Sequence, residues 1–164
     1  MLNWVKSVAQ LHNLASGEFV LPTSTRFAVA VHILAALAVN EGCAVRSEQL
    51  ASSASTNPTV IRRILSMLAE AGLTSSQLGY GGGATLAKPA NQITLLNVFQ
   101  AVEELNIFEM HRTPPDENCF VGRNIQQVLT LTTTKAQQAL ETELAKITIA
   151  EVAQDIQTLA RIQN

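Results

Sequence analysis

Residues 57–72 carry the strongest structural signal in this sequence. Asn57 is a good helix N-cap, and Pro58 fits the first helical position because its missing N–H needs no partner there. Gly72 suits the left-handed residue that ends many helices. The stretch therefore predicts a sharply delimited helix, and the helical period directs these residues to a core: Val60, Ile61, Ile64, Leu65 and Leu68.

A second, shorter helix is predicted just before it. Residues 47–53 have helical character with Ser47 as the expected N-cap, and a polar turn, Ala54–Thr56, follows. A short helix, a tight turn and a second helix form the helix-turn-helix arrangement.

The outer side of the second helix has polar chemistry. Thr59, Arg62, Arg63 and Ser66 recur at helical spacing. An arginine can donate two hydrogen bonds to guanine, and hydroxyl groups bind phosphates. An ordinary solvated helix face would show the same pattern, so the row by itself leaves both interpretations open.

A glycine-rich segment follows this helix. Residues 73–77 and 84–87 predict two short strands, and Gly79, Tyr80, Gly81, Gly82 and Gly83 predict the loop between them. Such a hairpin is the wing of a winged helix-turn-helix. Residues 79–84 also match the spacing of a dinucleotide-binding fingerprint, but that motif requires a helix directly after it, and Pro89 argues against one. We therefore expect a protein that is not an enzyme.

The rest of the chain predicts more helices. The first spans residues 23–39, capped by Ser24 or Thr25, and another spans 93–105, capped by Thr94. A long helix of about 22 residues begins near Arg123, and Thr148–Glu151 forms a capping box for a last one. Because so long a helix has little core to pack on within a small domain, we expect its apolar seam to pair with a second copy.

Composition narrows the class of protein. Residues 23–91 carry five basic and three acidic side chains, whereas residues 92–164 carry five basic and nine acidic ones. The basic segment contains the predicted helix-turn-helix, which is a weak pointer to nucleic acid. Two cysteines are too few for a disulfide framework, and the apolar run at 27–39 is short for a membrane span, so we expect a cytoplasmic protein.

Four segments summarise the expected organisation: an N-terminal extension (1–22), a winged helix-turn-helix domain (23–105), a linker (106–122) and dimerisation helices (123–164). The expected fold class is mainly α with a small β wing.

Taken in order, these parts resemble the Rrf2 family of bacterial winged helix-turn-helix regulators. The matching stretches are STRFAVAVHIL from Ser24, RRILSMLAEAGL from Arg62, GYGGGATLAKP from Gly79 and ITLLNVFQAVEE from Ile93. The resemblance implies a homodimer whose long helices cross, a recognition helix in the major groove of double-stranded DNA and a wing in the minor groove. The residues that it implicates in DNA contact are Thr25, Arg26, Ser47, Thr56, Asn57, Thr59, Arg62, Arg63 and Gly79–Gly83 with Tyr80.

The sequence departs from the family pattern in two places. Members that bind an iron–sulfur cluster carry three cysteines in the linker, whereas this chain has only Cys119 there, so the resemblance is to a branch without a cluster and we expect no cofactor. Wings of the family usually carry Arg or Lys where this chain has Gln77 and Leu78, which weakens the expected phosphate contact.

Cys119 precedes the long helix, where the helix dipole favours a thiolate and Arg123 could assist. Two interpretations remain: a thiol that senses oxidants, and a small residue that anchors the linker.

The leading hypothesis is thus a sequence-specific DNA-binding transcriptional regulator, a homodimeric repressor that responds to thiol oxidation through Cys119. The alternative is a winged-helix protein-interaction module without DNA binding, favoured by the acidic net charge of −2.

Overall fold

The computed structural model describes residues 25–79, 81–103 and 108–163. The helices are α2 (Arg26–Val39), α3 (Ser47–Ser53), α4 (Pro58–Glu70), α5 (Leu95–Val102), α6 (Phe120–Leu144) and α7 (Ile149–Ile162), with a short 3₁₀ turn, η2 (Ala90–Gln92). Strands β1 (Thr74–Gln77) and β2 (Gly83–Leu86) pair antiparallel. The expected fold class, mainly α with a small β hairpin, is confirmed. The extension at residues 1–22 and Tyr80 lie outside the described residues.

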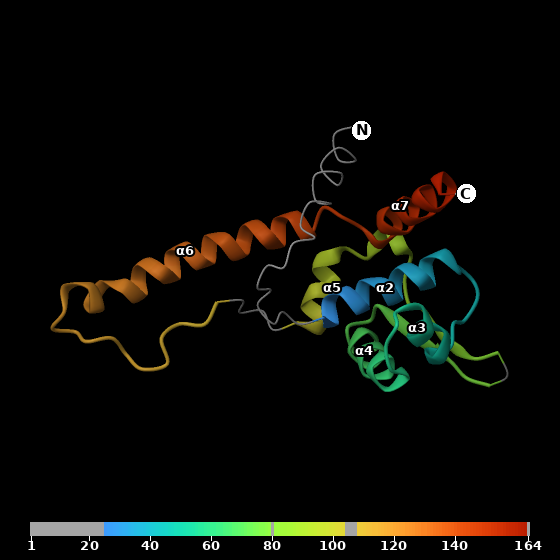
Figure 1. Cartoon of the computed structure of the whole chain (residues 1–164), viewed down its shortest axis with the longest axis horizontal. Coiled ribbons are helices and arrows are strands. Elements are labelled where there is room, and N and C mark those ends of the chain that lie inside the picture. The colour runs from blue at the N-terminus through green and yellow to red at the C-terminus, as the bar shows by residue number, and fades with distance from the viewer. Residues whose placement is uncertain (1–24, 80, 104–107, 164) are drawn as a thin grey trace.

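One core holds the winged-helix body together. Helix α2 lies at its centre and packs on α4, α5, α7 and β2 (Figure 1). Fully buried aliphatic side chains from every part of the body fill this core: Ile33, Leu34, Leu50, Ile61, Ile64, Leu68, Leu73, Ile93, Val98, Val102 and Ile149. Of the residues predicted to face a core from α4, Ile61, Ile64 and Leu68 are buried, but Val60 is 43% exposed, so its assignment was wrong.

The predicted helix limits hold where caps mark them. Asn57 caps α4 and accepts a hydrogen bond from the Thr59 N–H at 2.8 Å, while Gly72 follows the helix with φ +68°. Thr94 caps α5 as expected, and Thr148 forms the expected capping box of α7 with Glu151. The capping box that Thr94 forms with Asn97 was not predicted. Ser47, by contrast, is the first residue of α3 rather than its cap: the residue before the helix is Arg46, whose backbone N–H donates to the Gln49 side chain.

Helix α7 returns to the body after the long helix. Its start is tied to the start of α5, since the Ile149 N–H donates to the Ile93 carbonyl and the Leu95 N–H donates to the Ile147 carbonyl. Ile149 is fully buried in the core, and α7 packs along α2. The last helix therefore completes the winged-helix body, although the sequence pattern grouped it with the dimerisation segment.

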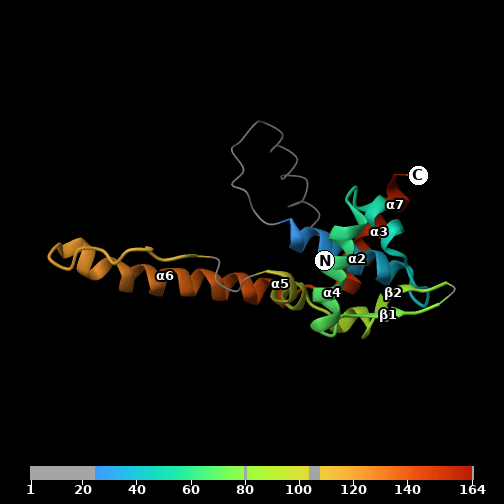
Figure 2. The same ribbon diagram turned by 90° about the horizontal axis from the view of Figure 1, so that it is seen from below.

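Helix α6 extends away from this body (Figures 1 and 2). It is continuous over 25 residues and has no buried residue. The threonines at 132–134 do not interrupt it: the Thr132 and Thr133 hydroxyls donate to the carbonyls of Val128 and Leu129 one turn earlier. Residues 108–111 of the preceding linker lie along the middle of α6 and form grooves with it.

Candidate nucleic-acid interface

The outer face of α4 presents the predicted polar row to solvent. Thr59, Arg62, Arg63 and Ser66 are all exposed, while Ile61, Ile64 and Leu68 anchor the opposite side in the core. Because the anchoring side chains are aliphatic and fully packed, the helix cannot rotate about its axis, and the polar row stays directed outward. Asn57 is also exposed at the start of the helix.

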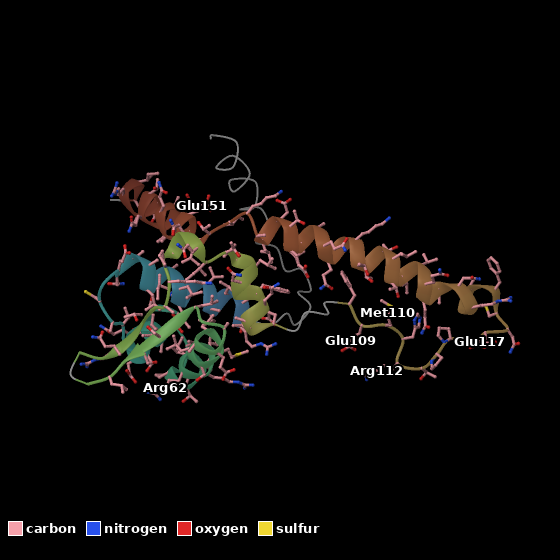
Figure 3. All side chains as sticks on the ribbon, turned by 180° about the vertical axis from the view of Figure 1, so that it is seen from behind. Arg62, Glu109, Met110, Arg112, Glu117 and Glu151 are labelled. Carbon is pink, nitrogen blue, oxygen red and sulfur yellow. The ribbon has the colours of Figure 1, made fainter. Side chains whose placement is uncertain are left out.

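The hairpin borders the same face. A cleft of about 350 Å³ lies between α3, α4 and the strands, lined by Arg62 and Ser66 from α4 and by Ser76, Gln77 and Gly83 from the hairpin. Figure 3 shows Arg62 at the edge of the body, next to the strands. The helix and the wing therefore border one cleft.

The glycines of the wing are required by the backbone itself. Gly81 has φ +80°, where residues with a side chain are strained. A Cβ on Gly83 would lie 2.6 Å from the Val45 carbonyl oxygen, because Val45 and Ala84 exchange two backbone hydrogen bonds of 3.0 and 2.9 Å. Val45 thus extends the hairpin with a short third segment, which no sequence signal announced.

Arg62 is held by α3. Its Nη2 donates to Glu48 Oε1 at 2.5 Å, its Nε donates to Ser47 Oγ at 3.3 Å, and the Ser47 hydroxyl donates to the same carboxylate oxygen at 3.2 Å. The pKa of the Glu48 carboxyl is lowered by its own backbone N–H and by the Arg62 and Ser47 side chains. Sequence reasoning missed Glu48, because nothing in the spacing of residues 48 and 62 shows that two helices bring them together.

The remaining predicted residues do not line this cleft and have contacts of their own. Thr25 precedes α2 and is exposed. Arg26 forms an ion pair of 3.0 Å with Glu103, and the other oxygen of that carboxylate accepts from the Phe27 N–H. Thr56 is half-buried and closes the turn between α3 and α4 by donating its N–H to the Ala51 carbonyl.

Comparisons with known proteins fit this geometry. Residues 23–155 match the model of the Rrf2 family, described as iron-dependent transcriptional regulators. The chain belongs to the Rrf2 family. YwnA of Bacillus subtilis (strain 168), named as a candidate helix-turn-helix regulator of transcription, is 38% identical over 130 residues, which cover 79% of this chain and 95% of YwnA.

Solved structures agree with this assignment. A crystal structure described as a candidate DNA-binding protein is 38% identical, with a TM-score of 0.62, covering 77% of this chain and 97% of that one. A candidate transcriptional regulator from Lactobacillus plantarum is 26% identical, with a TM-score of 0.67, covering 85% of this chain and 97% of that one. The protein is therefore a winged-helix, DNA-binding transcriptional regulator of the Rrf2 family.

The side chains that the structure describes bear on iron ligation in this Rrf2 chain. Iron–sulfur clusters are held by several cysteine thiolates. The two cysteines lie apart, Cys43 after α2 and Cys119 directly before α6, and no three His, Cys, Asp or Glu side chains within the described ranges gather around a common point. The donor set of the described residues therefore does not fit a cluster.

Cys119 is an exposed free thiol at the residue that caps α6. The backbone N–H groups of Gly122 and Val121, in the first turn of the helix, lower the pKa of the thiol. These backbone groups, rather than the Arg123 side chain, supply the effect. Asp116 shapes the turn before the helix: its carbonyl accepts from the Cys119 N–H, and its carboxylate accepts from the Asn118 N–H.

No helix in the described part of the chain is both long enough and apolar enough to cross a bilayer.

Proposed function

We propose that this Rrf2 protein is a homodimeric repressor that inserts α4 into the major groove of its operator and places the wing against the neighbouring minor groove. One observation carries the proposal: Arg62 and Ser66, two members of the exposed row on α4, line a single cleft together with residues of the wing. The contacting residues are Thr25, Arg26, Ser47, Thr56, Asn57, Thr59, Arg62, Arg63 and the glycine loop 79–83. Such a regulator acts on DNA in the cytoplasm, without enzymatic activity and without an iron–sulfur cluster.

The dimer is formed by α6. Val121, Val128 and Leu131 lie seven and three residues apart, so they share one side of the helix, and each is more than half exposed. A row of aliphatic side chains in water is unfavourable, and a second copy of the same helix would cover it. Two winged helices joined in this way would read a palindromic operator, and a dimer seated on a promoter would exclude polymerase.

Cys119 makes this dimer sensitive to oxidants. Its lowered pKa favours the thiolate, the form that oxidants attack, and its position at the start of α6 links the thiol to the dimer helix. With a peroxide as the oxidant, the thiolate sulfur would attack one peroxide oxygen, forming an S–O bond as the O–O bond breaks and releasing hydroxide or an alkoxide. The resulting sulfenic acid would place a new polar group at the first turn of α6 and thereby change how the helices pair.

The duplex contact is tested with a double variant, Arg62→Ala with Arg63→Ala, in a mobility-shift assay against bound genomic fragments. Each lost base or phosphate contact removes about 1–3 kcal/mol, and each of the two protomers loses two such contacts, so specific binding should fall at least about a hundredfold while the dimer persists. The matched control is Arg112→Ala with Arg161→Ala, which removes the same charge from exposed positions away from α4. Equal losses in both variants would show that only net charge matters, and unchanged binding would favour a protein-interaction module.

A further inference from the structure

The two neighbouring arginines of α4 differ in what holds them. The guanidinium of Arg62 is fixed to Glu48 and Ser47, which lie 14 and 15 residues earlier in the chain on α3. For the adjacent Arg63, the part of the chain that the structure describes supplies no side-chain hydrogen bond and no ion pair. Of these two exposed arginines, Arg62 is therefore held by side chains of α3, whereas no described side chain holds Arg63.

The geometry of the held arginine leaves one edge of the guanidinium available. A guanidinium has five N–H donors in a planar fork. Glu48 and Ser47 use the edge made by Nε and one hydrogen of Nη2. The opposite edge, made by Nη1 and the second hydrogen of Nη2, keeps the parallel pair of donors that matches guanine O6 and N7.

The stability of the fold does not explain the ion pair between Arg62 and Glu48. Both side chains are 60% exposed, and ion pairs in water contribute little to folding because solvent screens them. The carboxylate also lies on the surface that would approach DNA, where a negative charge opposes phosphates. What the pair does on this surface is fix the direction of the Arg62 guanidinium, which Glu48 and Ser47 both hold.

We propose that Glu48, with Ser47, is a positioning residue that presents Arg62 to a guanine in the operator, whereas the unheld Arg63 binds phosphate. This inference rests on the proposed function. Holding the side chain before binding reduces the conformational entropy lost on contact, and it restricts Arg62 to one direction of approach. Glu48 thereby contributes to sequence discrimination without touching a base.

Two variants at one position separate orientation from charge. Glu48→Ala and Glu48→Gln both remove the negative charge, but Gln keeps an oxygen that can accept from Arg62. In the full-length dimer, the ratio of nonspecific to specific Kd should fall about tenfold for Glu48→Ala, by less for Glu48→Gln, and by little for Arg63→Lys. Single base-pair changes across the operator should show that Glu48→Ala loses discrimination at one G·C pair. Thermal melting should be unchanged in all three variants.

A charge-only role predicts a different result. If Glu48 merely repelled phosphates, Ala and Gln would tighten specific and nonspecific binding equally, with an unchanged ratio. That outcome would overturn the positioning role while leaving DNA binding by α4 intact.

A measurement without DNA tests the holding itself. In the free protein, the Arg62 Nε–H should exchange slowly enough to give a ¹⁵N NMR signal that weakens in Glu48→Gln and disappears in Glu48→Ala. If Arg62 and Arg63 exchange equally fast in the wild type, the inference fails whatever the DNA experiments show. If the Arg62 signal is protected but the wild type shows no specific DNA binding, the proposed function fails, and with it the role assigned to the pair.

Discussion

The winged-helix body and α6 are both helical, yet they are stabilised in opposite ways. Helix α4 buries three aliphatic side chains in 13 residues, whereas α6 buries none in 25. An isolated helix is only marginally stable in water, and packing of an apolar face normally supplies the rest. The body is therefore complete within one chain, while α6 lacks a partner for its exposed side. The buried core that stabilises the body thus lies outside α6, and the dimer proposed above would use α6 instead of that core.

A leucine-to-glutamate substitution should have its largest effect in the winged-helix body, where it should abolish folding. Leu68→Glu places a charge at a position with no solvent access, and the cost of burying it, at least about 5 kcal/mol, is comparable to the whole stability of a small domain. We expect loss of the folded body, measured by circular dichroism and chemical denaturation. If the variant unfolds cooperatively with the same denaturation midpoint as the wild type, Leu68 does not anchor α4 in the core.

Leu131→Glu should act on assembly instead. Leu131 is 60% exposed, so the body should melt as in the wild type, while the dimer dissociation constant rises on the order of a hundredfold, about 3 kcal/mol. Sedimentation at several concentrations measures the effect. Gln126→Glu is the control, because a separation of five residues turns it about 140° around the helix from Leu131. If the control weakens the dimer equally, the proposed interface is on the wrong side of α6.

Within the body, the cap of α4 should matter less than the core. Asn57→Ala removes the acceptor for the Thr59 N–H and should lower the free energy of unfolding by about 1 kcal/mol. Asn57→Asp, which keeps an acceptor at the same place, should retain most of the stability. Denaturant titration measures both, and a loss in the Asp variant equal to that in Ala would show that the cap bond contributes nothing.

The smallest expected effect is on the reactivity of the Cys119 thiol at the start of α6. Because backbone N–H groups lower the pKa of Cys119, the thiolate should persist to lower pH in the folded chain than in the denatured chain. The alkylation rate of Cys119, followed peptide by peptide with mass spectrometry, should rise at lower pH in the native protein. If the alkylation rate depends on pH in the same way in the native and the denatured protein, the start of α6 does not lower the pKa of Cys119. The argument for redox sensing would then fail.

Local signals account for most of what could be predicted along the chain. Asn57, Pro58 and Gly72 delimited α4, and Thr94 and Thr148 marked the starts of α5 and α7, because a cap acts within three or four residues and is visible in sequence. The exposed row on α4 followed from helical period alone. One error arose where period was the only guide, since Val60 fitted an apolar stripe but lies at its open edge. A second concerned a cap: Arg46, and not Ser47, precedes α3.

Tertiary structure decided the contacts between distant segments. The helices, the hairpin and the chemistry available on α4 could be predicted from the sequence, since they depend on neighbouring residues. The same local information was silent on long-range contacts. It could not show that α7 returns to bury Ile149 against α2, that Val45 joins the wing, or that Glu48 holds Arg62, because each contact joins residues brought together only when the core forms. The residue types of the site thus follow from local sequence, whereas their arrangement in space follows from packing.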